Sequence, residues 1–330
     1  MRSEETVGTV MVDPRQLRVH ASHLDAVRAR FAAVRAASQK IARDQGAFGP
    51  LCGWIFTGLG DRHARQDELI AYVEENLFIA ADGLRRIAAG HGDLTELSSG
   101  DGDDSDIDAA TTPWETRRSG SEVAERVIEA VQSREWVDDL LAGAAPVVEF
   151  AAPATDSFTA LRAGSLDWAL AYIPSLRRML DDLTGMPELV AAHAATWRTI
   201  ATDLHRIGAD LWSCLDRDLS GWPWPEVRGY RTMMSHNVDA IAGLADISAA
   251  MALITKAAGD LILLTRDIVR GLVADLVARL VSWMAGTRSV VPLPVTASQL
   301  TTAVVTCWRI HSYVNALVTS LAHLSSYADG

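Results

Sequence analysis

Residues 187–219 read PELVAAHAATWRTIATDLHRIGADLWSCLDRDL. Core-type residues recur in this stretch only at intervals of three and four, which is the spacing of one helix face. They are Leu189, His193, Trp197, Ile200, Leu204, Ile207, Leu211 and Leu215. SGWPWP follows at 220–225, and its two prolines predict a sharp turn. We therefore predict a long helix, a turn, and a return helix that continues, or restarts near Ala249, as far as Trp283.

The rest of the chain also carries helical signals, separated by turns rich in glycine and proline. Asp13-Pro14 places a capping carboxylate and an N1 proline at the start of the first helix. Helices are predicted over 13–45, 61–89, 121–141, 166–183 and 296–327, with turns over 46–60 and 286–295. No convincing strand alternation is found, so we predict an all-α fold. Two helices alone cannot bury their apolar stripes, so we expect an elongated helical bundle built from two helical hairpins with additional helices.

The composition changes abruptly over residues 92–112. Seven acidic residues occur there without a basic one: Asp93, Glu96, Asp101, Asp103, Asp104, Asp106 and Asp108. Such a run repels itself and lacks apolar anchors, which favours a flexible linker. We predict four parts: a helical hairpin over 1–91, the acidic linker over 92–112, a connecting helix with an Ala/Pro-rich segment over 113–164, and a long helical module over 165–330.

The composition of the 330-residue chain excludes several classes of protein. Its 42 acidic and 30 basic residues give a net charge of −12, which argues against a nucleic-acid binder. Its 3 cysteines are too few and too scattered to predict a disulfide framework or a zinc site. The first residues lack the apolar core of a cleavable secretory signal, and charges interrupt the most apolar tract. A soluble protein is expected.

The turn at 220–230 carries the most informative motif. Trp222 and Trp224 stand in the turn, and Tyr230 follows on the return helix. This pattern resembles the hairpin of the WXG-type proteins of actinobacterial type VII (ESX) secretion, in which an indole closes the end of a helix pair. Trp224 stands where that family has glycine. With Trp197 on the preceding helix, these residues are the predicted turn and interaction motif.

Two longer stretches are similar to proteins of the same secretion system. Asp167-Trp168, the run Leu176–Gly185, Trp197 and the tract Gly259–Trp283 resemble the long WXG-like modules of secreted actinobacterial proteins. Over residues 11–96, Val12-Asp13-Pro14, the Gly49-Pro50 turn and Leu84–Ala89 resemble the small EspC-like secretion targets. The order of the two stretches is similar to EspB and to the PE–PPE pairs. That resemblance implies that the two hairpins pack into one bundle, with separately folded modules as the alternative.

The export motif of that family is a tyrosine with an acidic residue four positions later. At the corresponding place this chain has Gly92 and Glu96. The tyrosines Tyr72, Tyr172 and Tyr230 are likewise not followed by an acidic residue at that spacing. This departure favours a partner that supplies the export signal.

Signals for chemistry are weak. Asp104, Asp106, Asp108 and Glu115 approach the spacing of a calcium loop, but Ala109 stands where glycine is required, so a solvated linker is favoured.

His20 and His23 could together hold a metal ion on the first helix, but Arg15, Arg18 and Arg28 crowd them, which favours a hydrogen-bonding role. Cys52 stands in a turn, where a small apolar filler is favoured over a reactive thiol. Since catalytic and phosphate-binding motifs are lacking, we expect no catalytic, cofactor-binding or metal-binding residues and no cofactor.

The leading hypothesis is a non-enzymatic type VII (ESX) secretion-associated protein, an exported substrate or a targeting module. One alternative is a cytosolic chaperone or pairing partner of an ESX-secreted toxin. Another is a membrane-active secreted helical protein, because the tract 259–283 and the apolar tip 290–295 suit a lipid surface.

The expected partners are the secretion machinery or its chaperone, a WXG-type helical partner or a second copy, without nucleic acid and with membrane contact left open. The protein is expected in the cytoplasm before export, and afterwards secreted or in the cell envelope.

Overall fold

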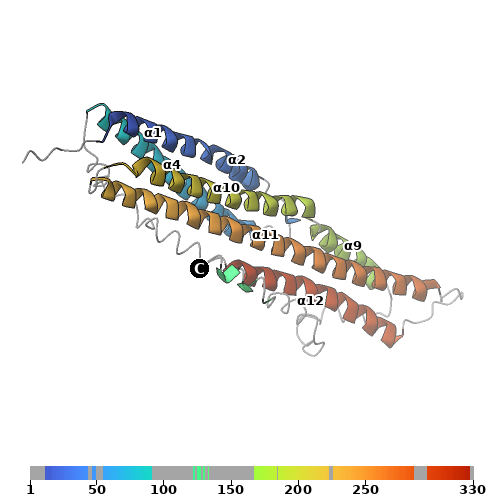
Figure 1. The fold of residues 1–330 in the computed structure, drawn as a ribbon. Helices are drawn as coiled ribbons and strands as arrows, with labels where there is room; N and C mark the ends of the chain where they lie inside the picture. The colour runs from blue at the N-terminus through green and yellow to red at the C-terminus, as the bar shows by residue number, and fades with distance from the viewer. Residues whose placement is uncertain are drawn as a thin grey trace, which may run out of the picture. The chain divides into compact units, whose positions relative to one another are not determined.

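Helices account for nearly all of the described chain. The computed structural model describes residues 12–43, 47–49, 55–90, 122, 125–127, 129–130, 133, 167–183, 185–222, 226–285 and 296–327. Its long helices are α1 (Pro14–Ala29), α2 (Phe31–Arg43), α4 (Ile55–Ala88), α9 (Asp167–Asp182), α10 (Pro187–Leu219), α11 (Glu226–Ala285) and α12 (Ala297–Tyr327) (Figure 1). None of these residues forms a strand, which confirms the predicted all-α class. The finer division into two hairpins stays a prediction.

Local sequence signals set several helix ends. The Asp13 carboxylate accepts a hydrogen bond from Arg15 N at 2.8 Å and caps α1, with Pro14 next to it. Thr296 and Gln299 form a reciprocal capping box at the start of α12. The Gln299 side chain accepts from Thr296 N at 2.9 Å, and Thr296 Oγ1 accepts from Gln299 N at 3.3 Å. The beginnings of these two helices were therefore readable from the sequence.

Two predicted boundaries were wrong. The first predicted helix is divided at Arg30 into α1 and α2. The Arg30 N–H donates to Val27 O, three residues back, as in one turn of a 3₁₀-helix. No proline or glycine explains this step. The helix predicted from residue 61 begins at Ile55 instead, although the sequence includes Gly58 and Gly60. Glycine costs only about 1 kcal/mol in a helix, so packing of the rest of α4 can override it.

The described helices belong to two compact units, each made of segments that are distant in sequence. The first unit comprises Met1–Arg43, Asp61–Glu125 and Ala195–Met251, and the second comprises Asp44–Gly60, Arg126–Ala194 and Ala252–Gly330. Helices α4, α10 and α11 each contribute residues to both units. Each unit is described by itself below.

In the first unit, α1 and α2 run antiparallel to α4. Arg18 donates to Ala88 O near one end of this pair, and Ser38 contacts His63 near the other end. Residues 195–219 of α10 and 226–251 of α11 also run antiparallel: Asp216 pairs with Arg231, and His205 lies 3.8 Å from Asp246.

Contacts between these two helix pairs complete the first unit. Arg30 pairs with Asp210, and the Gln66 amide donates to Ser248 Oγ at 2.5 Å. The apolar columns predicted on the first helix lie in the core: Leu17, Leu24, Val27, Phe31, Val34 and Ile41 are all at most 6% exposed. The predicted face of α10 is also buried from Trp197 to Leu215.

In the second unit, two backbone segments cross at a pair of glycines. Gly49 and Gly185 both have positive φ, +76° and +38°. A Cβ on Gly49 would lie 2.8 Å from Asp182 O, and one on Gly185 would lie 2.9 Å from Ala47 O. Met186 N donates to Ala47 O at 2.7 Å across this crossing. Glycine is therefore required at both positions, for backbone conformation and for space.

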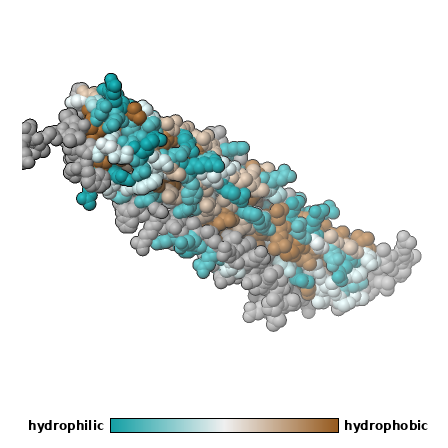
Figure 2. Space-filling model, in the orientation of Figure 1, coloured by the Kyte–Doolittle hydropathy of each residue, from teal (hydrophilic) through white to brown (hydrophobic). Residues whose placement is uncertain are grey.

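Helix α11 is long and apolar enough to cross a membrane over Val227–Trp283, although 56% of its most apolar window is buried within the protein. A core helix of a water-soluble protein has the same properties, so this is weak evidence for a span. On the face shown in Figure 2, hydrophilic and hydrophobic side chains are interspersed.

Several predictions lie outside the described residues. They are the acidic linker over 92–112, the calcium-like spacing from Asp104 to Glu115, Cys52, Trp224 and the apolar tip 290–295. The described residues of the predicted helix 121–141 are helical. The predicted domain boundaries at 91, 112 and 164 stay predictions.

Candidate functional site

A buried polar cluster lies in the first unit, where α1 meets the end of α10. Its centre is Asp218, whose side chain is 9% exposed. Three groups approach the same carboxylate oxygen, Oδ2: His20 Nδ1 at 2.9 Å, His23 Nδ1 at 2.6 Å and Cys214 Sγ at 3.2 Å. Arg217 Nε donates to the other oxygen, Oδ1, at 3.0 Å. The cluster thus joins two residues of α1 to three residues of α10.

Helix geometry brings these side chains together. His20 and His23 are three positions apart on α1, and Cys214 and Asp218 are four positions apart on α10, so each pair lies on one face of its helix. Leu17 and Leu24 flank the histidines and are fully or almost fully buried, which seats this face of α1 in the core. The core packing therefore positions the polar groups.

Aromatic side chains from the turn and from α11 enclose the buried face of His20. Tyr230 Oη lies 2.9 Å from His20 Nε2. The Trp222 and Tyr230 rings are stacked, 6.4 Å between centroids, and both meet the His20 ring edge-on at 5.7 Å. Trp222 is 6% exposed and Tyr230 is fully buried. The turn between α10 and α11 is thus closed by an indole that packs against α1.

Burial lowers the pKa of His20, and the hydrogen bond and negative charge of Asp218 only partly oppose this effect. We therefore assign a neutral imidazole at pH 7. Because a carboxylate only accepts, Nδ1 carries the proton and donates to Asp218. Nε2 then accepts from the Tyr230 hydroxyl, whose own pKa burial raises well above its ordinary value.

The same environment lowers the pKa of Asp218 and raises the pKa of Cys214. Burial opposes ionisation of Asp218, but hydrogen bonds from His23, His20, Cys214 and Arg217 outweigh it and hold the pKa of the carboxyl well below its usual range. Burial and the neighbouring carboxylate raise the pKa of the Cys214 thiol to about 12. A buried thiol of this kind is not an activated nucleophile, so the cluster does not have the chemistry of a cysteine hydrolase.

A second group in the first unit combines the residue types of a hydrolase triad. Ser38 Oγ lies 2.5 Å from His63 Nε2 and donates to Asp67 Oδ1 at 2.6 Å. In a catalytic triad the carboxylate binds the other nitrogen of the histidine, whereas here it contacts the serine directly. Ser38 is also only 1% exposed, so a substrate cannot reach its hydroxyl group. The group is a polar cross-link between α2 and α4.

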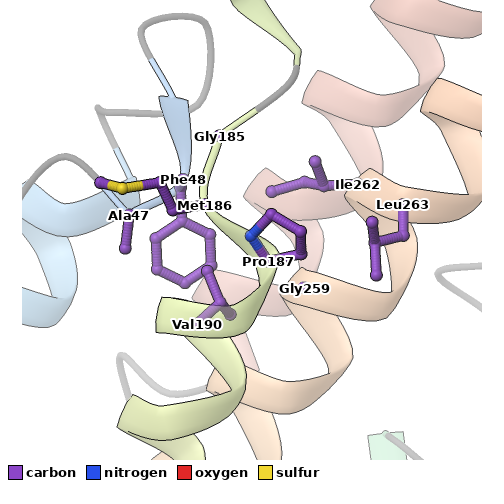
Figure 3. Close-up of a pocket in the computed structure, with 9 residues that line it drawn as sticks. All are labelled: Ala47, Phe48, Gly185, Met186, Pro187, Val190, Gly259, Ile262 and Leu263. Carbon is purple, nitrogen blue, oxygen red and sulfur yellow. The ribbon is translucent and has the colours of Figure 1, made fainter.

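The second unit contains an apolar hollow beside the glycine crossing. About 220 Å³ of space, part of it open to solvent, is lined by Phe48, Met186, Pro187, Val190, Ile262 and Leu263 together with Ala47, Gly185 and Gly259. Figure 3 shows side chains from the turn at 47–48, the start of α10 and the middle of α11 around it. Among the described residues that line this hollow, none has a titratable side chain.

The structure places the predicted motif residues in two surroundings. Trp222 and Tyr230 contact each other and the Asp218 cluster, whereas Trp197 is a core residue of α10 whose ring meets His63 edge-on at 5.0 Å. His20 and His23, which stand three positions apart on the first predicted helix, both contact Asp218.

Sequence reasoning missed Cys214 and Asp218. Their four-residue spacing was visible, but nothing local indicated that it would face the histidines. Comparisons with models of protein families, with curated proteins and with solved structures found no match to this chain.

Proposed function

We propose that this protein is a non-enzymatic component of type VII (ESX) secretion, an exported substrate or a targeting module built from two helical hairpins. The observation that carries the proposal is the closure of the α10–α11 turn by Trp222 and Tyr230. The indole is buried against the tyrosine and against His20 of α1. The same use of tryptophan and tyrosine characterises the WXG-type hairpins that the sequence resembles.

Packing within the first unit supports this proposal. Helices from the EspC-like region and from the WXG-like region share one core, and polar pairs such as Arg30–Asp210 and Asn76–Asn237 join them. Each helix pair alone would expose an apolar stripe to water. Such mutual burial is what a bundle assembled from two hairpins requires.

The test compares culture filtrate with cell lysate in actinobacterial cells with and without the ESX ATPase. We expect the protein in the filtrate only when the ATPase is present. Trp222→Ala should reduce its amount there, whereas Trp212→Ala, at a residue that is 46% exposed on α10, should not. Retained helicity, measured by circular dichroism, shows that the variant still folds. An extracellular level that is independent of the ATPase would refute export.

The second candidate is a cytosolic pairing partner of an exported toxin. The chain has Gly92 where the export motif has a tyrosine, which favours this second candidate. A cytosolic pairing partner needs no export signal of its own. Helix α4 also exposes Tyr72, Phe78 and Ile79 by 42% to 52%, which is apolar surface that a partner could cover. Co-purification from cytosol with a neighbouring gene product, with none in the filtrate, would support this candidate.

Membrane activity remains a third proposal for the apolar tract of α11. Flotation of the purified protein with liposomes tests it. If the protein floats with the lipid at physiological salt, membrane activity is supported. If the protein does not float with the lipid, this candidate is removed.

A further inference from the structure

Three side chains contact the same oxygen of one carboxylate, Asp218 Oδ2. His20 Nδ1, His23 Nδ1 and Cys214 Sγ lie 2.9, 2.6 and 3.2 Å from it. A carboxylate oxygen has about two lone-pair directions, so these contacts saturate it. A nitrogen, a sulfur and an oxygen atom that can each bind a metal ion therefore lie close together here.

The distances fit a tetrahedral metal centre. The ligand atoms of His20, Cys214 and Asp218 all lie within 4.8 Å of one another, and Cys214 Sγ lies 3.6 Å from His20 Nδ1. Zinc bonds of about 2.0 to 2.3 Å at tetrahedral angles place neighbouring ligand atoms about 3.3 to 3.6 Å apart. The three observed separations, 2.9, 3.2 and 3.6 Å, need adjustments of a few tenths of an ångström at most.

We propose that His20, Cys214 and Asp218 bind one divalent transition-metal ion of the zinc class, with the fourth position facing His23. Thiolate and imidazole ligands select zinc-like ions over magnesium and calcium, which prefer oxygen. His23 is 39% exposed and contacts the same carboxylate oxygen, while Arg217 Nη2 lies 3.3 Å from its Nδ1. Helix α1 then supplies one ligand and α10 supplies two.

The surrounding groups suit the second shell of such a site. When His20 Nδ1 binds the ion, its proton is held at Nε2 and is donated to the Tyr230 hydroxyl, which lies 2.9 Å away. Arg217 holds Asp218 Oδ1 at 3.0 Å and leaves Oδ2 for the ion. The ion displaces the proton of the Cys214 thiol to solvent, so one proton is released for each ion bound.

Two of the three arginines that crowd the histidines in the sequence have their contacts elsewhere. Arg18 donates to Ala88 O, and Arg28 lies over the Phe78 ring near Asp25 and Glu74. The basic group in contact with the cluster is Arg217, which is 64% exposed and therefore well screened by solvent. Thiolate and carboxylate together balance the charge of a divalent ion, which makes its burial favourable.

The proposed ion would join parts of the chain that are 191 to 198 residues apart. It would fasten α1 to the end of α10, beside the turn that Trp222 closes. Its role is structural, because the cluster is packed by Leu17, Trp222 and Tyr230. It does not depend on the proposed role in secretion: a protein that binds the ion without being exported would leave this inference intact.

The test uses the full-length chain stripped of metal with a chelator. Titration with Zn²⁺ should show one ion bound per chain and a higher unfolding temperature. Co²⁺ should give a thiolate-to-cobalt charge-transfer band together with the visible bands of tetrahedral coordination. Absence of saturable Zn²⁺ binding, or a cobalt spectrum without a thiolate band, would overturn the proposal.

Matched variants locate the ion. Cys214→Ala and His20→Ala should weaken Zn²⁺ binding by more than about 100-fold, and Tyr230→Phe by about 10- to 100-fold, as second-shell changes do. Cys307→Ala is the control, because Cys307 is also a buried free thiol but belongs to α12 in the second unit. Circular dichroism without metal checks that each variant folds, and Cys214→Ser is the substitute if the alanine variant does not. A thiolate band that survives removal of the Cys214 sulfur would place the ion elsewhere and refute the site.

Discussion

His20 Nε2 lies 2.9 Å from Tyr230 Oη, although the two residues are 210 positions apart in the chain. Both side chains are fully buried, and Trp222 packs against both rings. Removing either partner would leave the other polar atom unpaired in the core, at a cost of about 1 to 3 kcal/mol. This contact therefore couples the packing of α1 to the closure of the α10–α11 turn.

Trp222→Ala should strongly destabilise the first unit. The indole is 6% exposed, and its removal leaves a cavity beside His20 and Tyr230. Truncation of a buried tryptophan costs about 3 to 5 kcal/mol of the free energy of unfolding. Urea unfolding measures the loss. Trp212→Ala is the matched control, because Trp212 is 46% exposed and should cost less than about 1 kcal/mol. Equal losses for the two variants would contradict a closing role for Trp222.

Gly49→Ala should destabilise the protein more than Gly90→Ala. Both glycines have positive φ, +76° and +84°, so each alanine variant pays about 1 kcal/mol for the left-handed conformation. Only the Cβ at residue 49 would also meet backbone, at 2.8 Å from Asp182 O, whereas nothing lies within 4 Å of a Cβ at Gly90. We expect a further loss of about 1 to 3 kcal/mol for Gly49→Ala. Thermal unfolding of the two variants checks this order, and a larger effect at Gly90 would contradict it.

The metal-free protein should lose stability as the pH falls below about 6.5. Burial lowers the pKa of His20 in the folded state, so the unfolded chain binds the proton first on acidification. The stability that His20 contributes is therefore complete above its unfolded pKa and decreases as the pH falls toward its folded pKa. Urea unfolding with a chelator at about pH 7.5 and 5.5 should show a smaller decrease for His20→Gln than for the wild type. An identical decrease in both proteins would show that His20 does not contribute.

Thr296→Ala should weaken the start of α12. It removes the side-chain oxygen that accepts from Gln299 N, and loss of such a cap costs about 1 kcal/mol. Thr296→Ser keeps the hydroxyl and should lie within a few tenths of a kcal/mol of the wild type. Urea unfolding compares the three proteins. A serine variant as unstable as the alanine variant would show that the methyl group, rather than the capping oxygen, is what matters.

Much of the secondary structure could be predicted because its signals are local. The start of α10 at Pro187 and its end at Leu219 follow from proline placement and three-and-four spacing. The start of α4 was wrong by six residues, because packing tolerated glycines that local propensity counts against a helix. The sequence also indicated the buried face of the first helix, since Leu17, Leu24 and Phe31 lie on one side of it.

The sequence by itself determined the all-α class and the apolar faces of the main helices. It also determined the turn that contains Trp222 and the placement of His20 and His23 on one face of the first helix. Only the tertiary structure decided what that face meets. Cys214 and Asp218 reach His20 and His23 across more than 190 residues, and such pairings depend on how apolar stripes from distant helices pack together. A helix forms through hydrogen bonds between residues that are close in sequence, so a local pattern can predict it. A site shared by two helices depends on how their faces pack, which no local pattern encodes.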